Sequence, residues 1–248
     1  MEQTPRAGQR VAFFGGSFDP PHQGHLAVAR AARVALALGT VLFAPVGAQP
    51  LKPKGSTAGF DDRVAMTRLA IAADPAFSLS LFDAPKPSGA PNYTIDTLFE
   101  LRAQLPPDGA LFCLMGADSF LGLRRWHRSA ELPFVAPLIV ASRPGQPLDD
   151  LRAALPQGLT MEPATGALPA LNGPADDALE VRSFVLRNSA GETAPFYLLP
   201  DLHIDISASQ IRDLIRDETR AAIESSVAGQ QLLPVSVLNY IRTHELYR

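Results

Sequence analysis

A turn near the start of the chain holds residue types that bind phosphate groups. The stretch GGSFDPPHQGH, residues 15–25, lies between an apolar run, Val11 to Phe14, and a segment with helical period. Glycines let a ligand approach the backbone closely, and the N–H groups of the turn and of the helix start can donate hydrogen bonds to phosphate oxygens. His22 and His25 are three residues apart, so both imidazoles can face one ligand, donate hydrogen bonds and add charge when protonated. The turn is therefore predicted to bind phosphate.

Other turn types fit these residues less well. No Lys-Ser or Lys-Thr pair follows the glycines, as a Walker loop requires, and the GxGxxG dinucleotide fingerprint is absent. A metal site built on His22 and His25 has only Asp19 nearby as a third ligand and no cysteine. A purely architectural glycine-proline turn is the remaining alternative.

The elements around the turn follow a regular alternation. Strands are expected at 10–15, 40–46, 77–83, 110–116, 137–145, 179–186 and 196–201, and helices at 25–38, 61–73, 94–105, 204–218 and 234–247. This order predicts an α/β fold: a Rossmann-like, doubly wound, mostly parallel sheet with helices on both faces and a small C-terminal helical part. The phosphate turn follows the first strand, at the carboxyl edge where such sheets bind their ligands.

The composition is typical of a globular protein. The chain has 248 residues, of which 46% are hydrophobic and 19% charged, so it can bury a full core as one domain, residues 1–248. Residues of about 144–196 are rich in Pro, Ala, Gly and Asp, which predicts a loop-like insertion outside the catalytic sheet, with one strand-like piece at 179–186.

Charge and cysteine content exclude several partners. The formal net charge of -3 offers no electrostatic reason to expect nucleic acid or a membrane surface. The single cysteine, Cys113, lies in an apolar strand, so neither a disulfide nor a cysteine-based metal site is expected. With no export signal and no apolar run long enough to span a bilayer, the sequence predicts a cytoplasmic protein. A homo-oligomer is compatible with all of this.

Several motifs together resemble one enzyme family. GGSFDPPHQGH resembles the signature of the HxGH nucleotidyltransferase superfamily, and its Pro-Pro before the first histidine is similar to bacterial nicotinate-nucleotide adenylyltransferases. SASQIR, residues 207–212, resembles the second motif of that family, a turn rich in Ser and Thr that opens a helix carrying an arginine. APNYTIDTL, GADSFLGLRRWHR, ASRPG and VLNYIRTHELY follow in the family's order and spacing, so the resemblance covers most of the chain.

The resemblance implies transfer of the adenylyl group of ATP to nicotinate mononucleotide, giving deamido-NAD and pyrophosphate in NAD biosynthesis. It implies Mg²⁺ bound with the ATP phosphates and no metal site made by the protein. The implied catalytic residues are His22, His25, Lys52 and Arg212. The implied ATP-binding residues are Gly15, Gly16, Ser17, Phe18, Gly24, Ile206, Ser207 and Ser209. The implied nicotinate mononucleotide-binding residues are Asp19, Tyr93, Thr94, Gly116, Asp118, Trp126, His127 and Arg143.

The chain also departs from the family. Relatives commonly have Pro-Pro-His-Lys after the second strand, whereas this chain has QPLK, so Leu51 replaces the usual histidine and only Lys52 is kept. Single residues have simpler explanations as well. Thr94 or Asp118 could cap a helix, Trp126 could be a core aromatic, and Lys52 or Arg212 could be solvated charges.

Rival functions share the first motif. A sibling adenylyltransferase acting on nicotinamide mononucleotide or phosphopantetheine, or a cytidylyltransferase, would use the same turn. Trp126 and His127 favour a planar pyridine ring, because such a ring needs a stacking platform and a pantetheine arm does not. A binding module with a decayed site and a metal-dependent hydrolase are the rivals from other classes.

Overall fold

The computed structural model describes residues 8–52, 55–142, 147–165, 181–199, 207–217 and 232–248. The chain divides into two compact units. The first unit comprises residues 1–15, 28–42 and 93–203, and the second comprises residues 16–27, 43–92 and 204–248. The predicted site residues Arg143 and Ile206 lie outside the described part of the chain.

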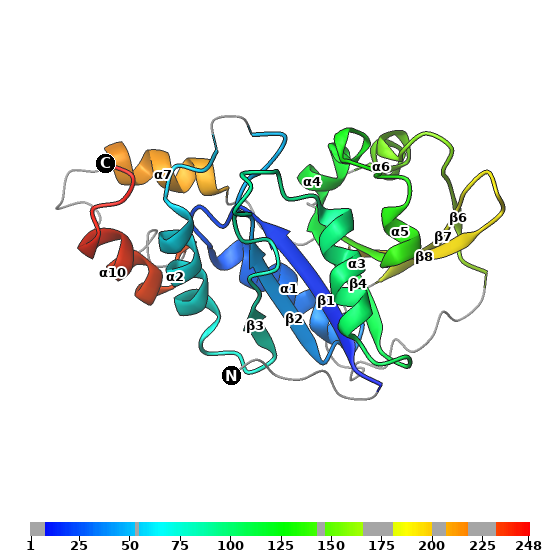
Figure 1. Ribbon diagram of the computed structural model, residues 1–248, viewed down its shortest axis with the longest axis horizontal. Helices are drawn as coiled ribbons and strands as arrows, with labels where there is room; N and C mark the ends of the chain where they lie inside the picture. Colours follow the sequence, from blue (N-terminus) through cyan, green and yellow to red (C-terminus); the bar gives the residue numbers. More distant parts are fainter. Residues whose placement is uncertain (1–7, 53–54, 143–146, 166–180, 200–206, 218–231) are drawn as a thin grey trace. The chain divides into compact units, whose positions relative to one another are not determined.

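The strands form a mostly parallel sheet in the order β3-β2-β1-β4-β5-β8-β7-β6 (Figure 1). Their bounds are β1 Arg10–Gly16, β2 Thr40–Pro45, β3 Phe77–Leu79, β4 Ala110–Gly116, β5 Leu138–Ala141, β6 Thr160–Pro163, β7 Arg182–Arg187 and β8 Thr193–Leu199. Strand β4 pairs in parallel with β1 and β5, and β8 pairs in parallel with β5, whereas β7 runs antiparallel to both β8 and β6. The predicted α/β class is confirmed.

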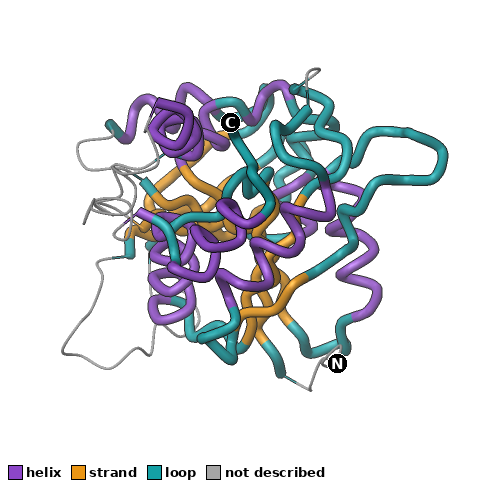
Figure 2. The backbone as a smooth tube through the Cα atoms, turned by 90° about the vertical axis from the view of Figure 1, so that its left-hand side faces the viewer, coloured by secondary structure: helices purple, strands orange, loops and turns teal. Residues whose placement is uncertain are grey.

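Helices alternate with these strands along the chain, and Figure 2 separates the two by colour. The helices are α1 Gln23–Ala35, α2 Phe60–Ile71, α3 Thr94–Gln104, α4 Ala117–Leu121, the 3₁₀ turn η1 Leu123–Arg125, α5 Leu132–Val135, α6 Leu148–Ala154, α7 Ala208–Asp217 and α10 Val235–Thr243. Among the described residues, no helix is long and apolar enough to cross a membrane.

Helix α1 ends earlier than its apolar pattern predicted. The N–H of Leu38 donates to the carbonyl of Arg33, and Ala37, at a φ of 47°, occupies the left-handed position of a Schellman motif. The sequence offers no glycine at this position, so the end of the helix was placed too late. Val34, an apolar residue in the last turn of α1, is 44% exposed.

The central strands of the first unit are buried on both faces, as their continuous apolar sequence predicts. Val11 to Phe14 are each at most 5% exposed, and Val11 lies beside Leu111 in the parallel register of β1 and β4. Cys113 is buried in β4, as expected. The core of this unit is therefore organised around β1, β4 and β5.

The segment 144–196 contributes more to the sheet than its composition predicted. Its described residues include α6, β6, β7 and most of β8, and Phe196, which pairs with Leu138 of β5, is fully buried. The expectation that the segment lies outside the sheet is wrong for these residues. The predicted strands at 179–186 and 196–201 overlap β7 and β8, whereas the four-residue strand β6 and helix α6 were not predicted, because the loop-like average composition hid them. That the segment is an insertion stays a prediction.

Candidate active site

The turn between β1 and α1 is shaped by Phe18. Its φ is 47°, and its ring is buried against Phe43, with ring centroids 5.6 Å apart, and against His25 at 5.0 Å. A Cβ at Gly16 would lie 3.3 Å from this ring, so a glycine leaves the ring undisturbed. The Phe18 side chain therefore belongs to the core, and only the backbone of the turn is available to a phosphate group.

The two histidines face each other, as their spacing predicted. Their ring centroids lie 3.8 Å apart with an interplanar angle of 34°. The backbone N–H of His22 donates to Nδ1 of His25 at 3.2 Å, so a neutral His25 carries its proton on Nε2. His22 is 6% exposed, and among the described residues its Nδ1 is a buried atom without a hydrogen-bond partner. Such an atom fits a site that a polar ligand completes.

Burial makes both imidazoles neutral. Burial lowers the pKa of His22 from 6.5 to about 4. Burial also lowers the pKa of His25 well below 6.5, and the positive charge that His22 would carry lowers it further. In the ligand-free protein near neutral pH, the two imidazoles therefore offer hydrogen bonds. They do not carry the positive charge that protonated histidines would add.

The positive charge of the site comes from Lys52 and its neighbours. Lys52 Nζ donates to Ser17 Oγ at 3.0 Å, and Ser17 Oγ donates to Gln49 Oε1 at 3.1 Å. Burial lowers the pKa of Lys52, as do the charges of Arg212 and Arg63, while the Asp19 carboxylate opposes them. The ammonium group is thus tied to the phosphate turn, and a polyanion would relieve the repulsion among these cations.

Arg63 of α2 was not recognised from the sequence. It is 2% exposed, and its guanidinium donates to the carbonyls of Ser17 at 2.7 Å and Val46 at 2.8 Å, and through Nε to that of Ala58 at 3.3 Å. The helical run DDRVAMTRLAIAA holds four charged residues, so nothing in it marked Arg63 as the buried one, although a buried arginine needs several acceptors. Arg63 holds the end of β2 and the phosphate turn in one arrangement.

Asn92, in the quoted motif APNYTIDTL, has a similar role. Its N–H donates to the carbonyl of Ala48 and its Oδ1 accepts from the N–H of Ala48, both at 2.9 Å, while Nδ2 donates to the carbonyl of Ala84. Gly47 lies so close to Pro85 that a Cβ there would be 2.4 Å from the proline nitrogen. The loop carrying Gln49 and Lys52 is therefore held at a defined distance from residues 84–85.

The side chain of Asp19, in the turn between β1 and α1, is buried. Its carboxylate accepts the N–H groups of Thr57 at 2.6 Å and Ala58 at 3.0 Å, and the hydroxyl of Tyr247 at 2.8 Å. Its backbone carbonyl accepts Nη1 of Arg212 at 2.7 Å. The predicted binding of nicotinate mononucleotide by Asp19 stays a prediction, because these contacts are all within the chain.

The second motif forms the start of α7. Ser207 Oγ accepts the N–H of Gln210 at 3.2 Å, and Gln210 Oε1 accepts the N–H of Ser207 at 3.0 Å, which together form a capping box. Arg212 also donates to Ser209 Oγ at 3.1 Å. The structure therefore brings Asp19, Ser209 and Arg212 together, and Ser207 fixes the helix that carries the arginine.

The first unit holds most residues predicted for nicotinate mononucleotide. The rings of Tyr93 and His127 lie 4.3 Å apart with an interplanar angle of 31°. Trp126 is half-buried directly after η1, and a Cβ at Gly116, the residue before α4, would meet open space. Tyr93 and His127 thus form an aromatic pair, and Gly116 leaves room at the end of β4.

Neither Thr94 nor Asp118 caps a helix, which was the alternative role considered for both residues. Tyr93, and not Thr94, is the N-cap of α3, and no side chain caps that helix. Asp118 lies in the first turn of α4, whose N-cap is Gly116, also without a side-chain cap bond. The interpretation of Thr94 as a cap is therefore wrong, because the helix begins at Thr94 itself, one residue earlier than that role requires.

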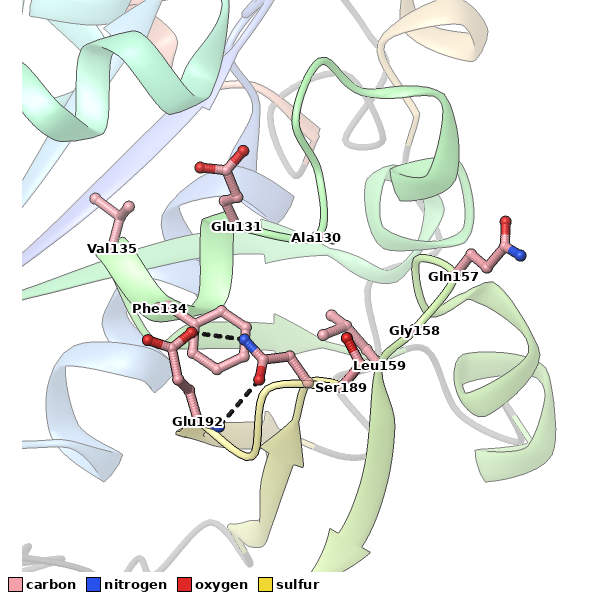
Figure 3. Close-up of a pocket in the computed structure, with 10 residues that line it drawn as sticks. Ala130, Glu131, Phe134, Val135, Gln157, Gly158, Leu159, Ser189 and Glu192 are labelled. Atoms are coloured by element: carbon pink, nitrogen blue, oxygen red, sulfur yellow. Dashed lines mark hydrogen bonds between the residues drawn. The ribbon is translucent and has the colours of Figure 1, made fainter.

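A separate cavity of about 340 Å³ lies in the first unit between residues 130–135, residues 157–159 and the β7–β8 turn (Figure 3). Asn188 Nδ2 donates to Glu192 Oε2 at 2.7 Å on one side of it. None of the predicted site residues lines this cavity. Within the described ranges, no group of three His, Cys, Asp or Glu side chains could hold a metal ion.

Comparisons with known proteins identify first the class and then the family of this chain. A family model described as cytidylyltransferase-like matches residues 13–214, which defines the class as nucleotidyltransferases of that fold. The chain is 35% identical to a probable nicotinate-nucleotide adenylyltransferase of Dechloromonas aromatica over 96% of this chain and 97% of that protein. It is 36% identical to one of Gloeobacter violaceus, covering 97% of each chain. The chain belongs to the nicotinate-nucleotide adenylyltransferase family.

Solved structures support the fold. The chain is similar, at a TM-score of 0.65 and 14% identity, to the Plasmodium falciparum nicotinic acid mononucleotide adenylyltransferase complexed with NaAD, over 96% of this chain and 97% of that one. A Vibrio parahaemolyticus structure titled as a putative nicotinate-nucleotide adenylyltransferase matches at a TM-score of 0.56 and 13% identity, over 97% of this chain and 96% of that one.

The lowered pKa of His22 predicts acid-sensitive stability. Between the unfolded pKa of 6.5 and the folded pKa of about 4, the unfolded state binds more protons, so stability is full above pH 6.5 and falls as the pH drops. His22 alone should remove about 2 kcal/mol of unfolding free energy between pH 7 and pH 5. Urea unfolding at both pH values measures this. The His22→Gln variant should show a flatter dependence, and equal slopes for the two proteins would contradict the assignment.

The Lys52 contact predicts a role in ATP binding. Lys52→Ala should raise the KM for ATP by about tenfold or more, because a partly desolvated cation beside the phosphate turn is lost. Gln49→Ala, which frees the Ser17 hydroxyl that anchors Lys52, should raise the same constant by a smaller factor. Lys86→Ala, at another lysine of the second unit, is the control. Steady-state kinetics at saturating acceptor decides, and an unchanged KM in Lys52→Ala would show a surface charge only.

Proposed function

We infer that this chain transfers the adenylyl group of ATP to nicotinate mononucleotide, forming deamido-NAD and pyrophosphate as a step of NAD biosynthesis. Membership of the family along nearly the whole chain supports the reaction. The observation that carries the mechanism is the facing pair His22 and His25 at the turn that also anchors Lys52. These residues offer donors and charge for a triphosphate and no activated nucleophile.

The reactants explain why no general base is needed. The 5′-phosphate of the mononucleotide has a second pKa of about 6, so at neutral pH it is largely a dianion and already a nucleophile. One of its oxygens bonds to the α-phosphorus of ATP, and the bond from that phosphorus to the bridging oxygen breaks as pyrophosphate leaves. The enzyme must bring two anions together and stabilise the charge that builds on the phosphates.

The turn after β1 and the cations near it supply that stabilisation. We assign the backbone of Gly15, Gly16, Ser17 and Phe18 to the phosphates, with Gly24 allowing close approach. His25 would donate from Nε2 to the α- and β-phosphate region, and His22 would act beside it. The two cations, Lys52 and Arg212, would neutralise the β- and γ-phosphates, and Ser209 orients Arg212 through its hydroxyl.

The first unit supplies the acceptor site in this proposal. The Tyr93 and His127 rings, with Trp126 nearby in the chain, provide flat surfaces for a pyridine ring. The N-terminus of α3, where Thr94 begins a helix without a side-chain cap, carries a partial positive charge that favours the carboxylate of nicotinate. Gly116 and Asp118, at the start of α4, are assigned to the rest of the nucleotide.

Mg²⁺ would come bound to the ATP phosphates, where it neutralises charge on the triphosphate and its leaving group. Such ions keep several water ligands and bind through substrate phosphates. We also propose that the protein acts in the cytoplasm as one nucleotidyltransferase domain and binds neither nucleic acid nor membranes, in keeping with its net charge of -3.

Substrate choice tests the proposed function. Pyrophosphate release from Mg-ATP should be fastest with nicotinate mononucleotide. With nicotinamide mononucleotide we expect a catalytic efficiency lower by roughly ten to a few hundred-fold, because the carboxamide leaves the carboxylate donors unpaired. Phosphopantetheine, and CTP in place of ATP, should give background rates and thereby exclude the sibling enzymes. Equal efficiencies on the two mononucleotides would contradict the proposed pyridine site.

The role of His25 in the chemistry is tested separately. His25→Ala should lower kcat by about 10²-fold or more, since its donor acts mainly on charge that develops in the transition state. Thermal unfolding should show that the variant is folded. The exposed His244, replaced by alanine, is the matched control and should keep kcat within about twofold. Near-normal turnover in His25→Ala would remove His25 from the mechanism.

A further inference from the structure

Tyr247 makes a buried contact with the phosphate turn that the mechanism above does not use. Its hydroxyl donates to Asp19 Oδ1 at 2.8 Å, joining residues 228 positions apart in the chain. Tyr247 is 6% exposed and Asp19 is 3% exposed. A buried carboxylate is costly unless donors surround it, so this hydroxyl is one of the groups that make the position of Asp19 stable.

The backbone after α10 takes an unusual course to place this side chain. The N–H of Leu246 donates to the carbonyl of Ile241 and that of Glu245 to Arg242, which ends α10 in a Schellman motif. Glu245 has a φ of 53° and Tyr247 a φ of 68°. Residues other than glycine rarely occupy this region. The backbone is therefore strained at Glu245 and Tyr247. The hydrogen bond from Tyr247 to Asp19 is among the interactions that offset this strain.

The contacts of Asp19 extend to Arg212, the arginine of the second motif. While Tyr247 and two backbone N–H groups hold the carboxylate, the carbonyl of Asp19 accepts Nη1 of Arg212 at 2.7 Å, and the same Nη1 lies 3.9 Å from Oδ2. Burial and the negative charge of Asp19 raise the pKa of Tyr247, so the phenol keeps its proton and remains a donor. The chain of contacts thus runs from Tyr247 through Asp19 to Arg212.

We propose that Tyr247 is a positioning residue for nucleotide binding: through Asp19, it holds Arg212 and the turn of residues 16–22 in the arrangement that receives the triphosphate. This proposal rests on the proposed function for the identity of the ligand. It concerns a residue that touches no substrate and acts through a buried carboxylate.

The chain offers a matched pair of variants. Tyr247→Phe removes only the hydroxyl that contacts Asp19. Tyr240→Phe removes an equivalent hydroxyl that donates to Asp62 Oδ1 at 3.0 Å, also between the C-terminal part of the second unit and an aspartate. Both variants should lower the melting temperature, since each loses one hydrogen bond to a charged group. Tyr247→Phe alone should raise the KM for ATP by about tenfold.

Binding of ATP to the protein without an acceptor separates this proposal from the proposed function. In titration calorimetry with Mg-ATP, Tyr247→Phe should weaken the Kd by about tenfold even if nicotinate mononucleotide proved to be the wrong acceptor. In an Arg212→Ala background, the Tyr247→Phe change should have little further effect on the Kd, because the two residues act in one chain of contacts.

Three results would overturn the proposal. The first is an unchanged Kd and KM for ATP in a folded Tyr247→Phe variant, which would show that Tyr247 serves stability alone. The second is an equal rise in Tyr240→Phe. The third is a full additional loss in the Arg212→Ala background. Should Tyr247→Phe not fold, Asp19→Asn weakens the same carboxylate, and an ATP Kd equal to that of the unmodified protein would overturn the proposal in its place.

Discussion

The second unit depends on how the Asp19 carboxylate is buried. A charge removed from water is tolerated only where donors replace the lost solvent, and here two backbone N–H groups and a phenol do so. Two of these donors, the N–H groups of Thr57 and Ala58, lie just before α2, and the third, the Tyr247 hydroxyl, lies after α10. Satisfying one carboxylate therefore positions the phosphate turn, the residues before α2 and the chain after α10 together.

The electrostatic balance of this region explains why it suits a polyanion. Burial and the charges of Arg212 and Arg63 lower the pKa of Lys52, and Asp19 is the carboxylate that counters them. Arg63 uses its donors on backbone carbonyls and so serves the architecture. Lys52 and Arg212 carry the remaining positive charge, and the neutral imidazoles add donors without adding repulsion. Neutral donors beside two cations suit a triphosphate, because both can stabilise the charge that builds on the phosphates in the transition state.

Hydrogen bonds hold Lys52 in this chain, which has Leu51 at the neighbouring position. Leu51 is 43% exposed, and its side chain offers no hydrogen bond. The chain links Lys52 to Ser17 and Ser17 to Gln49, and Asn92 and the close approach of Gly47 to Pro85 fix the loop that carries them. A hydrogen-bonded hydroxyl and amide thus anchor the cation within a rigid loop.

The sequence by itself determined the fold class, the phosphate turn, the facing of His22 and His25, and the family. These properties follow from local patterns: alternation of apolar runs, glycine and proline in a turn, and a three-residue spacing across a helix start. Local composition failed for β6 within 144–196, because a strand of four residues does not change the average of its segment.

Only the tertiary structure decided which polar groups meet. The bond from Tyr247 to Asp19, the three carbonyl acceptors of Arg63 and the neutral state of the histidines all depend on residues far apart in the chain and on exclusion of water. Ser207 and Phe18 show the same limit, since one caps its helix and the other fills the core although both lie in binding motifs. A motif names the residues of a site, whereas burial and distance determine what each of them can do, because hydrogen-bond partners and pKa values are properties of the folded environment.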